Sequence, residues 1–220
     1  MIDNNAKAMP VSTVVDRFFP VFDAYAAAVN LTPYNPLFGR PLGEIVQIWK
    51  QKGDEAKRLG TCLHQQIEKY YLNQPLDEET EEFHFFLRFT RDHPMTPYRT
   101  EWRIFDEEHN LAGTIDFITK NGNQYDIYDW KRSGKVVDNL GNIKSVNFGK
   151  TGIGGLSDIL DTAYNRYCLQ QNLYGYILEK HYGIIISNIY LVILHPDYDR
   201  YHKVEMPRMN KQIEYILSAL

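Results

Sequence analysis

Three short segments carry residue types that together could bind a divalent metal and hydrolyse a phosphate ester. They are Gly60-Thr61-Cys62-Leu63-His64, Gly113-Thr114-Ile115-Asp116 and Asp129-Trp130-Lys131. Carboxylates and an imidazole are ligands for Mg²⁺ or Mn²⁺, and a lysine beside them can stabilise charge that develops on phosphoryl oxygens. We therefore expect Asp116, Asp129 and Lys131 to carry the chemistry. His64 would complete the metal ligands.

A predicted hairpin brings the two aspartates together. If its turn is Asn121-Gly122 alone, Asp116 lies opposite Ile127 and Asp129 is the diagonal neighbour of Asp116 on the same face. Lys131, two residues further, shares that face. Two carboxylates that converge without a cation repel each other. The pattern therefore predicts a Mg²⁺ or Mn²⁺ site on this hairpin.

Each piece alone has a plainer interpretation. Glu55-Ala56-Lys57 is a second acid-x-Lys triplet with nothing attached to it, so the Asp129-to-Lys131 triplet could be an exposed ion pair. His64 could be a core histidine. Glu68, one helical turn further on, could orient the other ring nitrogen of His64 or form an ordinary helix pair. The combination, placed on strands, favours a site.

Hydrophobic periodicity, together with helix-breaking glycine and proline residues, assigns these segments to helices and strands. A helix is expected from near Leu42, with clear periodicity over 54–72 and the Gly60 motif at a helix start. The other expected helices cover 12–19, 21–29, 78–91, 158–182 and 209–219, and the expected strands cover 100–105, 111–119, 124–131, 184–194 and 201–206. The strand, crossover helix and strand from 124 to 194 predict a parallel pairing in a mixed sheet. Residues 132–157 read as a long loop.

Composition sets the broad class. With 220 residues, 44% of them hydrophobic, we expect one domain over 1–220, with a helical part over about 1–95 and a catalytic sheet with helices over about 96–220. No secretory signal or membrane span is evident, so a cytoplasmic protein, or one of the host cell interior if viral or phage, is expected. Cys62 and Cys168 are too few for a four-thiolate cluster.

Charge is unevenly distributed along the chain. The net charge of −4 argues against a generally basic nucleic-acid coat protein. The segment 131–150 nevertheless holds five basic residues against one acid, and from it we select Arg132 and Lys135 as substrate-binding candidates. The acidic run over 77–82 reads as a solvated helix start rather than a metal site.

Taken in order, Gly-Thr-x-x-His, Gly-x-x-Asp, Asp-x-Lys and Gln170-x-x-x-Tyr174 resemble the RecB-like exonuclease branch of the PD-(D/E)XK nuclease superfamily. The resemblance covers roughly 59–194. Within that branch the chain is similar to single-domain exonucleases of phages and large viruses, and more distantly to the mitochondrial genome maintenance exonuclease. Ile115-Asp116 stands where the superfamily name has Pro-Asp, which this branch usually lacks.

The resemblance implies an α/β fold with a mixed central sheet of about four strands flanked by helices. It implies a metal held by His64, Asp116, Asp129 and the main-chain carbonyl of Trp130, with Lys131 as the catalytic lysine. Three further positions complete the implied site: Gln170 and Tyr174, which shape it and contact the nucleic acid, and Glu101, a frequent acidic position. No iron–sulfur cluster is expected.

The expected function is a divalent-metal-dependent deoxyribonuclease, an exonuclease on single-stranded DNA or DNA ends in replication, recombination or repair. Its DNA strand would contact the basic loop and stack on aromatic residues such as Tyr174 or Phe148. Three alternatives stay open: a catalytically silent DNA-binding module, a structure-specific endonuclease, and acid/base chemistry by two carboxylates as in glycoside hydrolysis.

Overall fold

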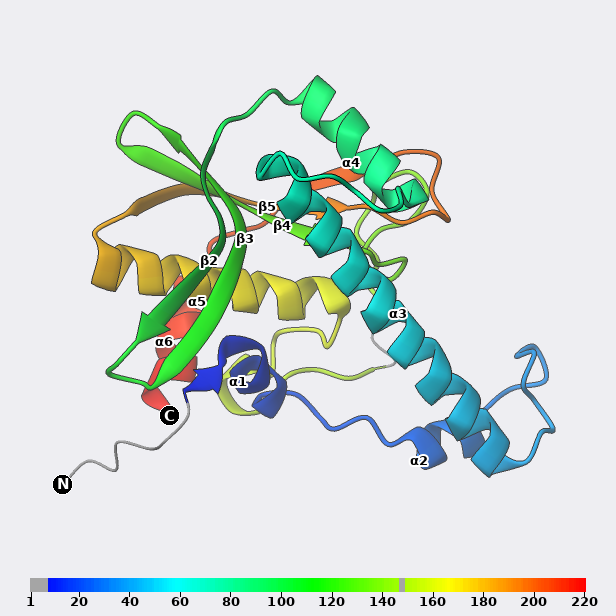
Figure 1. Ribbon diagram of the computed structural model, residues 1–220. Coiled ribbons are helices and arrows are strands. Elements are labelled where there is room, and N and C mark those ends of the chain that lie inside the picture. Colours follow the sequence, from blue (N-terminus) through cyan, green and yellow to red (C-terminus); the bar gives the residue numbers. More distant parts are fainter. Residues whose placement is uncertain (1–7, 147–148) are drawn as a thin grey trace.

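A mixed β-sheet of six strands, with helices on both faces, organises the computed structural model, which describes residues 8–146 and 149–220 (Figure 1). The strands are β1 (Met9–Pro10), β2 (Pro97–Asp106), β3 (Leu111–Asn121), β4 (Gln124–Lys131), β5 (Ile185–Ile193) and β6 (His202–Glu205). The helices are α1 (Val11–Arg17), α2 (Ala24–Val29), α3 (Leu42–Tyr71), α4 (Glu81–Asp92), α5 (Ala163–Tyr182) and α6 (Asn210–Ser218), with a 3₁₀ turn at Gly154–Leu156. The chain thus has a mixed α/β fold.

The pairing of the central strands follows the expected topology. The sheet order is β1-β3-β4-β5-β6, with β2 on the other edge of β3. β4 and β5 are parallel and α5 connects them, as the crossover pattern predicted. Six strands exceed the expected number of about four. β1 was not predicted, because two residues ending in proline show no strand periodicity.

Two hydrophobic layers cover the sheet. On one face, α1, α5 and α6 pack against side chains such as Ile127 and Ile189. On the other face, α3 and α4 pack against Phe117 and Trp130. Because both faces of β4 are covered, its apolar residues serve both cores, and a polar residue on this strand is buried unless the sheet opens beside it.

Helix α3 is longer than its periodicity suggested. It runs without interruption for 30 residues, roughly 45 Å, so Gly60 lies well inside it rather than at a helix start. The start at Leu42 follows Pro41, which ends the irregular proline-containing connection. Figure 1 shows the N-terminal half of α3 projecting away from the sheet together with α2. Its C-terminal half crosses the sheet and carries His64.

The hairpin between β3 and β4 turns one residue later than predicted. Asn121 pairs with Gln124, so the turn residues are Gly122 and Asn123, and Gly122 takes the left-handed backbone with φ +60°. The loop keeps two residues, and the faces of the strands are therefore as predicted. The register changes: because Phe117 pairs with Tyr128, Asp116 falls opposite Asp129 rather than opposite Ile127.

The 132–157 segment is only partly irregular. Val136, Val137 and Leu156 are buried, and short bridges join Val137 with Ile143 and Thr151 with Leu160. Phe148 and the N-terminal residues considered for a signal lie outside the described part of the chain. Among residues 8–146 and 149–220, no helix combines the length and apolar character that crossing a membrane requires.

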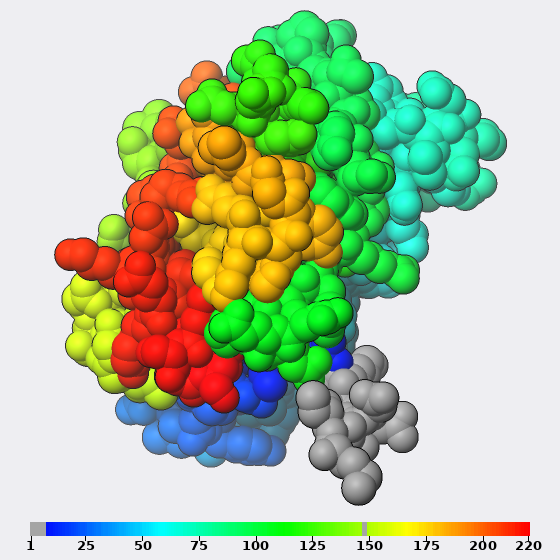
Figure 2. Space-filling view, turned by 90° about the vertical axis from the view of Figure 1, so that its left-hand side faces the viewer, coloured from blue at the N-terminus to red at the C-terminus, as the bar shows by residue number. Residues whose placement is uncertain are grey.

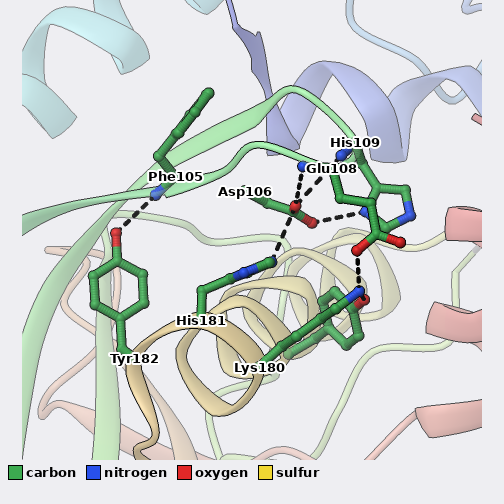
Figure 3. A network of polar contacts seen from close by, with 8 residues as sticks. Phe105, Asp106, Glu108, His109, Lys180, His181 and Tyr182 are labelled. Carbon is green, nitrogen blue, oxygen red and sulfur yellow. Dashed lines mark hydrogen bonds and ion pairs between the residues drawn. The ribbon is translucent and has the colours of Figure 1, made fainter.

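A buried carboxylate fixes the β2–β3 turn to the end of α5. Asp106 is fully buried and accepts hydrogen bonds from the His109 ring at 2.8 Å and from the Glu108 backbone at 2.9 Å, while His181 Nε2 lies 3.0 Å away (Figure 3). Burial opposes its charge, but the His109 hydrogen bonds outweigh burial and lower the pKa of Asp106. Figure 2 shows this turn lying against the end of α5 on the surface. The contact holds one end of the β2–β3 hairpin in place.

Candidate active site

The Gly113-to-Asp116 motif lies on β3, in a gap between the segments of β3 that pair with β1 and with β4. Along one edge of β3, β1 pairs with Leu111 and Ala112, and β4 pairs from Phe117 onward. The residues 113–116 between these pairs have no ladder partner on that edge in the described chain. Elsewhere the sheet keeps the groups on its two faces apart. At this gap, groups from both faces can meet.

Asp116 fills the end of the gap. Its Oδ2 accepts a hydrogen bond from the Trp130 backbone N–H at 3.0 Å, which replaces a missing strand contact. On the opposite edge, Thr100 pairs with Phe117 and Trp102 with Ile115, so the register sets Glu101 opposite Asp116. Glu101 has φ +46°, an unfavourable backbone conformation for a residue with a side chain. This strained residue directs a second carboxylate to the same place.

His64 reaches the gap from α3. Its Nε2 lies 2.9 Å from the Trp130 carbonyl oxygen, which can only accept, so Nε2 carries the proton. Its Nδ1 faces the acids, 3.6 Å from Asp116 Oδ2 and 3.9 Å from Glu101 Oε1. Burial works against a charge on the ring, but Asp116 and Glu101 outweigh it and raise the pKa of His64.

One sequence prediction changes with this geometry. The Trp130 carbonyl accepts a hydrogen bond from His64 Nε2 and so orients the ring, while its part as a metal ligand, implied by the resemblance, stays a prediction. Glu68 does not orient the ring, because both ring nitrogens already face other groups. Trp130 thus does what the sequence suggested for Glu68.

The donor set at the gap fits a divalent cation. One ligand atom each from His64, Glu101 and Asp116 lies within 4.8 Å of the others. Two carboxylates and one imidazole suit Mn²⁺ and accept Mg²⁺. With Nε2 protonated, a neutral His64 presents the lone pair of Nδ1 toward both acids. These three residues would hold the cation, and Glu101, a supporting residue in the sequence prediction, belongs among them.

Asp129 and Lys131 form a buried pair beside this group. Lys131 Nζ lies 2.6 Å from Asp129 Oδ2, although its direction does not meet hydrogen-bond geometry, so Oδ2 accepts no hydrogen bond from the described residues. Asp129 is 2% exposed, and burial raises its pKa to about 7 even though Lys131 favours the charged form. Burial also opposes the charge of Lys131, but Asp129 and Asp116 raise its pKa overall. Lys131 therefore stays protonated while Asp129 is balanced near neutrality.

Two residues of α5 complete the surroundings of this pair and were not predicted. Gln171 Nε2 donates to Asp129 Oδ1 at 2.6 Å. The ammonium of Lys131 lies 5.2 Å from the centre of the Tyr167 ring, within the range of a cation–π contact. Their helical spacing, four residues apart, could have suggested a shared face. The sequence gives no sign that this face, rather than the one of Gln170, meets Asp129.

Gln170 and Tyr174 form a wall of the site. Gln170 Nε2 donates to the Tyr174 hydroxyl at 2.9 Å. The Tyr174 ring packs so closely on Gly113 that a Cβ there would lie 2.2 Å from Tyr174 Cε1. This contact explains the glycine of the Gly113-to-Asp116 motif. Tyr174 is only 5% exposed, so its ring does not offer the base-stacking surface that the sequence suggested.

The predicted basic contacts are of two kinds. Arg132 forms an ion pair with Glu82, and both side chains are largely buried. Glu82 belongs to the acidic run over 77–82; that run does start a helix, but Glu82 is 6% exposed rather than solvated. Lys135 is exposed and remains able to contact a substrate. Arg132 therefore positions the chain after Lys131, and Lys135 is the better candidate for direct contact.

Comparisons with known proteins do not identify a family. No protein-family profile matches the chain, and no curated protein matches it. Among solved structures, the crystal structure of SSO0001 is similar over 96% of this chain and 73% of that chain, at 12% sequence identity and a TM-score of 0.37. A likeness at that level carries no argument about the site.

Proposed function

We propose that this chain is a divalent-metal-dependent deoxyribonuclease, an exonuclease that hydrolyses phosphodiester bonds in single-stranded DNA or at DNA ends. The observation that supports the proposal is the meeting of two groups at one gap in the sheet. The first is the His64, Glu101 and Asp116 set, and the second is the buried Asp129–Lys131 pair. A cation site beside a protonated lysine suits an anionic substrate better than a sugar.

The residues would divide the chemistry as follows. His64, Glu101 and Asp116 would hold Mg²⁺ or Mn²⁺, and Asp129 Oδ2 is an additional oxygen without a hydrogen bond from the described residues. A bound cation of this kind polarises the phosphate and acidifies a water. Lys131, protonated and partly buried, stabilises the negative charge that grows on the phosphoryl oxygens.

Asp129 suits the transfer of the proton. A carboxyl group whose pKa lies near 7 is about half ionised at neutral pH and can accept a proton from the attacking water. Gln171 and Lys131 hold its two oxygens in fixed directions. Tyr174 and Gly113 close one side of the site, and this packing limits the access of bulk water.

A direct assay tests the proposal. Labelled DNA, linear and circular, single-stranded and double-stranded, is incubated with Mg²⁺, Mn²⁺ or EDTA. We expect metal-dependent release of nucleotides from linear DNA and intact single-stranded circles. Asp116→Asn should abolish the activity, because Asn still accepts the Trp130 hydrogen bond but removes the charge. Asp158→Asn changes an exposed aspartate and is the matched control.

The alternatives give different products in the same assay. DNA binding with no product in either metal would identify a silent binding module. Cleavage of circles would identify an endonuclease. Loss of activity in Asp158→Asn to the same extent as in Asp116→Asn would contradict the assignment of the site.

A further inference from the structure

We propose a second phosphate-binding site in a surface hollow beside β6, where Arg88, Arg200 and Lys203 converge, and that it holds a backbone phosphate of the strand bound at the candidate active site. The choice of nucleic acid as the occupant rests on the proposed function. The hollow has a volume of about 490 Å³ and lies between α4, the loop before β6 and β6 itself. It is large enough for a nucleotide unit rather than only a small ion.

The three cations around the hollow are not bound in ion pairs among the described residues, in contrast to Arg132, which Glu82 neutralises. Arg88 lies over the Phe85 ring at 5.5 Å, and Lys203 Nζ lies 3.8 Å from the centre of the Tyr190 ring. Aromatic rings leave the positive charge in place, so these cations remain available to an anion.

Two further groups line the hollow. Asp92 is the acid among the lining residues, and its Oδ2 already accepts a hydrogen bond from the Tyr201 hydroxyl at 2.7 Å. His202 is 7% exposed, and its Nε2 has no hydrogen-bond partner in the part of the chain that the structure describes. The hollow thus combines an excess of positive charge with a buried polar atom that lacks a partner.

The position of the hollow relates it to the candidate active site. Lys131 pairs with Ile193 across β4 and β5, and Ile193 pairs with His202 across β5 and β6. Two strand spacings amount to roughly 10 Å. Lys131 and Ile193 end their strands and His202 begins its own, so all three lie at one end of the sheet. A DNA strand bound at both places would therefore have to pass around this end of the sheet.

The donor types favour a phosphate. Two guanidinium groups offer planar pairs of N–H donors that match two oxygens of a phosphate, and an ammonium group adds a point charge. Arg88 and Arg200 come from segments far apart in sequence, and the fold brings both to the rim of the same hollow. A DNA strand would therefore gain contacts here that a substrate confined to the catalytic site cannot make.

Binding without cleavage tests the proposal. Fluorescence anisotropy measures a labelled single-stranded oligonucleotide of about twelve nucleotides with the full chain in EDTA over a salt series. Arg88→Glu/Arg200→Glu should weaken binding at low salt at least about tenfold and reduce the salt slope by roughly 0.7, the contribution of one single-strand phosphate contact. The charge-matched control is Arg17→Glu/Lys211→Glu, two exposed positions away from the hollow, which should leave the slope unchanged.

Separate readouts distinguish this inference from the proposed function. Hydrolysis of a dinucleotide substrate with Mn²⁺ should be the same in wild type and in Arg88→Glu/Arg200→Glu. Equal losses of oligonucleotide binding in both charge-reversed proteins, or wild-type hydrolysis without oligonucleotide binding, would overturn the second site. Binding through the hollow with no hydrolysis by the wild type would overturn the nuclease instead. Inorganic polyphosphate that binds as tightly as DNA through the same arginines would overturn nucleic acid as the occupant.

Discussion

Gln171 donates a 2.6 Å hydrogen bond to Oδ1 of Asp129, the buried carboxylate beside Lys131. Burial raises the pKa of Asp129 to about 7, and a donor to a carboxylate favours its charged form, so the Gln171 hydrogen bond acts against burial. A residue outside the recognisable motifs therefore contacts the carboxylate whose ionisation matters at neutral pH.

Gln171→Leu should shift the acid limb of the activity profile toward higher pH. Without the donor, burial acts on Asp129 with less opposition, and its pKa rises above 7. Activity at neutral pH should fall, with partial recovery at higher pH. The pH dependence of kcat/KM measures this. Gln170→Leu is the matched control, because Gln170 bonds Tyr174, and a limb that moved equally in both variants would contradict the role of Gln171.

The Asp129–Lys131 pair should be strongly coupled in stability. Lys131→Met leaves a buried carboxylate without its cation, and we expect a loss of about 2 to 4 kcal/mol above pH 7. Because Lys131 lowers the pKa of Asp129 in the wild type, that pKa rises above about 7 in Lys131→Met, and the loss should shrink as the pH falls toward about 7, where Asp129 of the variant is already protonated. Asp129→Asn/Lys131→Met removes both charges and should be more stable than Lys131→Met alone.

The wild type, Asp129→Asn, Lys131→Met and the double variant form a double-mutant cycle. Urea unfolding of these four proteins at two pH values gives the coupling free energy between the two positions. All three variants should lack nuclease activity whatever their stability. Additive effects, with no coupling between the two positions, would show that the pair does not exist in solution.

As the pH is lowered, the affinity for a metal ion should begin to fall at a higher pH than it would at a site whose histidine has an ordinary pKa. In the metal-free site, Asp116 and Glu101 raise the pKa of His64, so a proton on Nδ1 competes with a cation to a higher pH than usual. Calorimetric titration with Mn²⁺ at about pH 6 and about pH 8 should show tighter binding at the higher pH.

His64→Ala should weaken Mn²⁺ binding at the higher pH and reduce its pH dependence. The matched control is His84→Ala, which removes an imidazole that faces Glu79 on the surface of α4. Equal Mn²⁺ affinities for wild type and His64→Ala would return His64 to a purely structural role.

Two glycines of the motifs should respond in opposite directions to alanine. Gly60 lies inside α3, and a Cβ there meets nothing within 4 Å. Gly60→Ala should therefore stabilise the protein by about 0.5 to 1 kcal/mol through helix propensity. Gly113→Ala should destabilise it and reduce activity, since the new methyl group displaces Tyr174. Thermal melts read both effects, and a stabilised Gly113→Ala would contradict the packing.

The faces of β3 and β4, which carry the site, could be predicted from the sequence, but the neighbouring strand β1 could not. The two-residue hairpin set the faces of β3 and β4 correctly although the turn lies at Gly122 and Asn123, because parity depends on loop length and not on its position. The gap beside Asp116 depends on the two-residue strand β1, which has no periodic pattern to detect.

Contacts between distant segments explain the remaining differences. The pairing of Arg132 with Glu82 joins residues that local patterns cannot relate. Gln170 and Gln171 are adjacent and chemically identical, and only the rotation of α5 about its axis decides which one meets Asp129. Glu101 faces His64 and Asp116 from a backbone conformation that is unfavourable for a residue with a side chain, so local propensity argues against this placement.

The two ends of the long helix α3 differ in how far they are stabilised by packing. Most of its residues before Gly60 are exposed, whereas Leu63 and Ile67 are buried under the α4 layer. A helical stretch without packing is marginal in water, so amide protons of the exposed residues 50–58 should exchange with solvent far faster than those around His64. Opening of this exposed stretch need not disturb the histidine, which is held at the sheet gap. One continuous helix thus projects an exposed stretch at one end and packs as a support for His64 at the other.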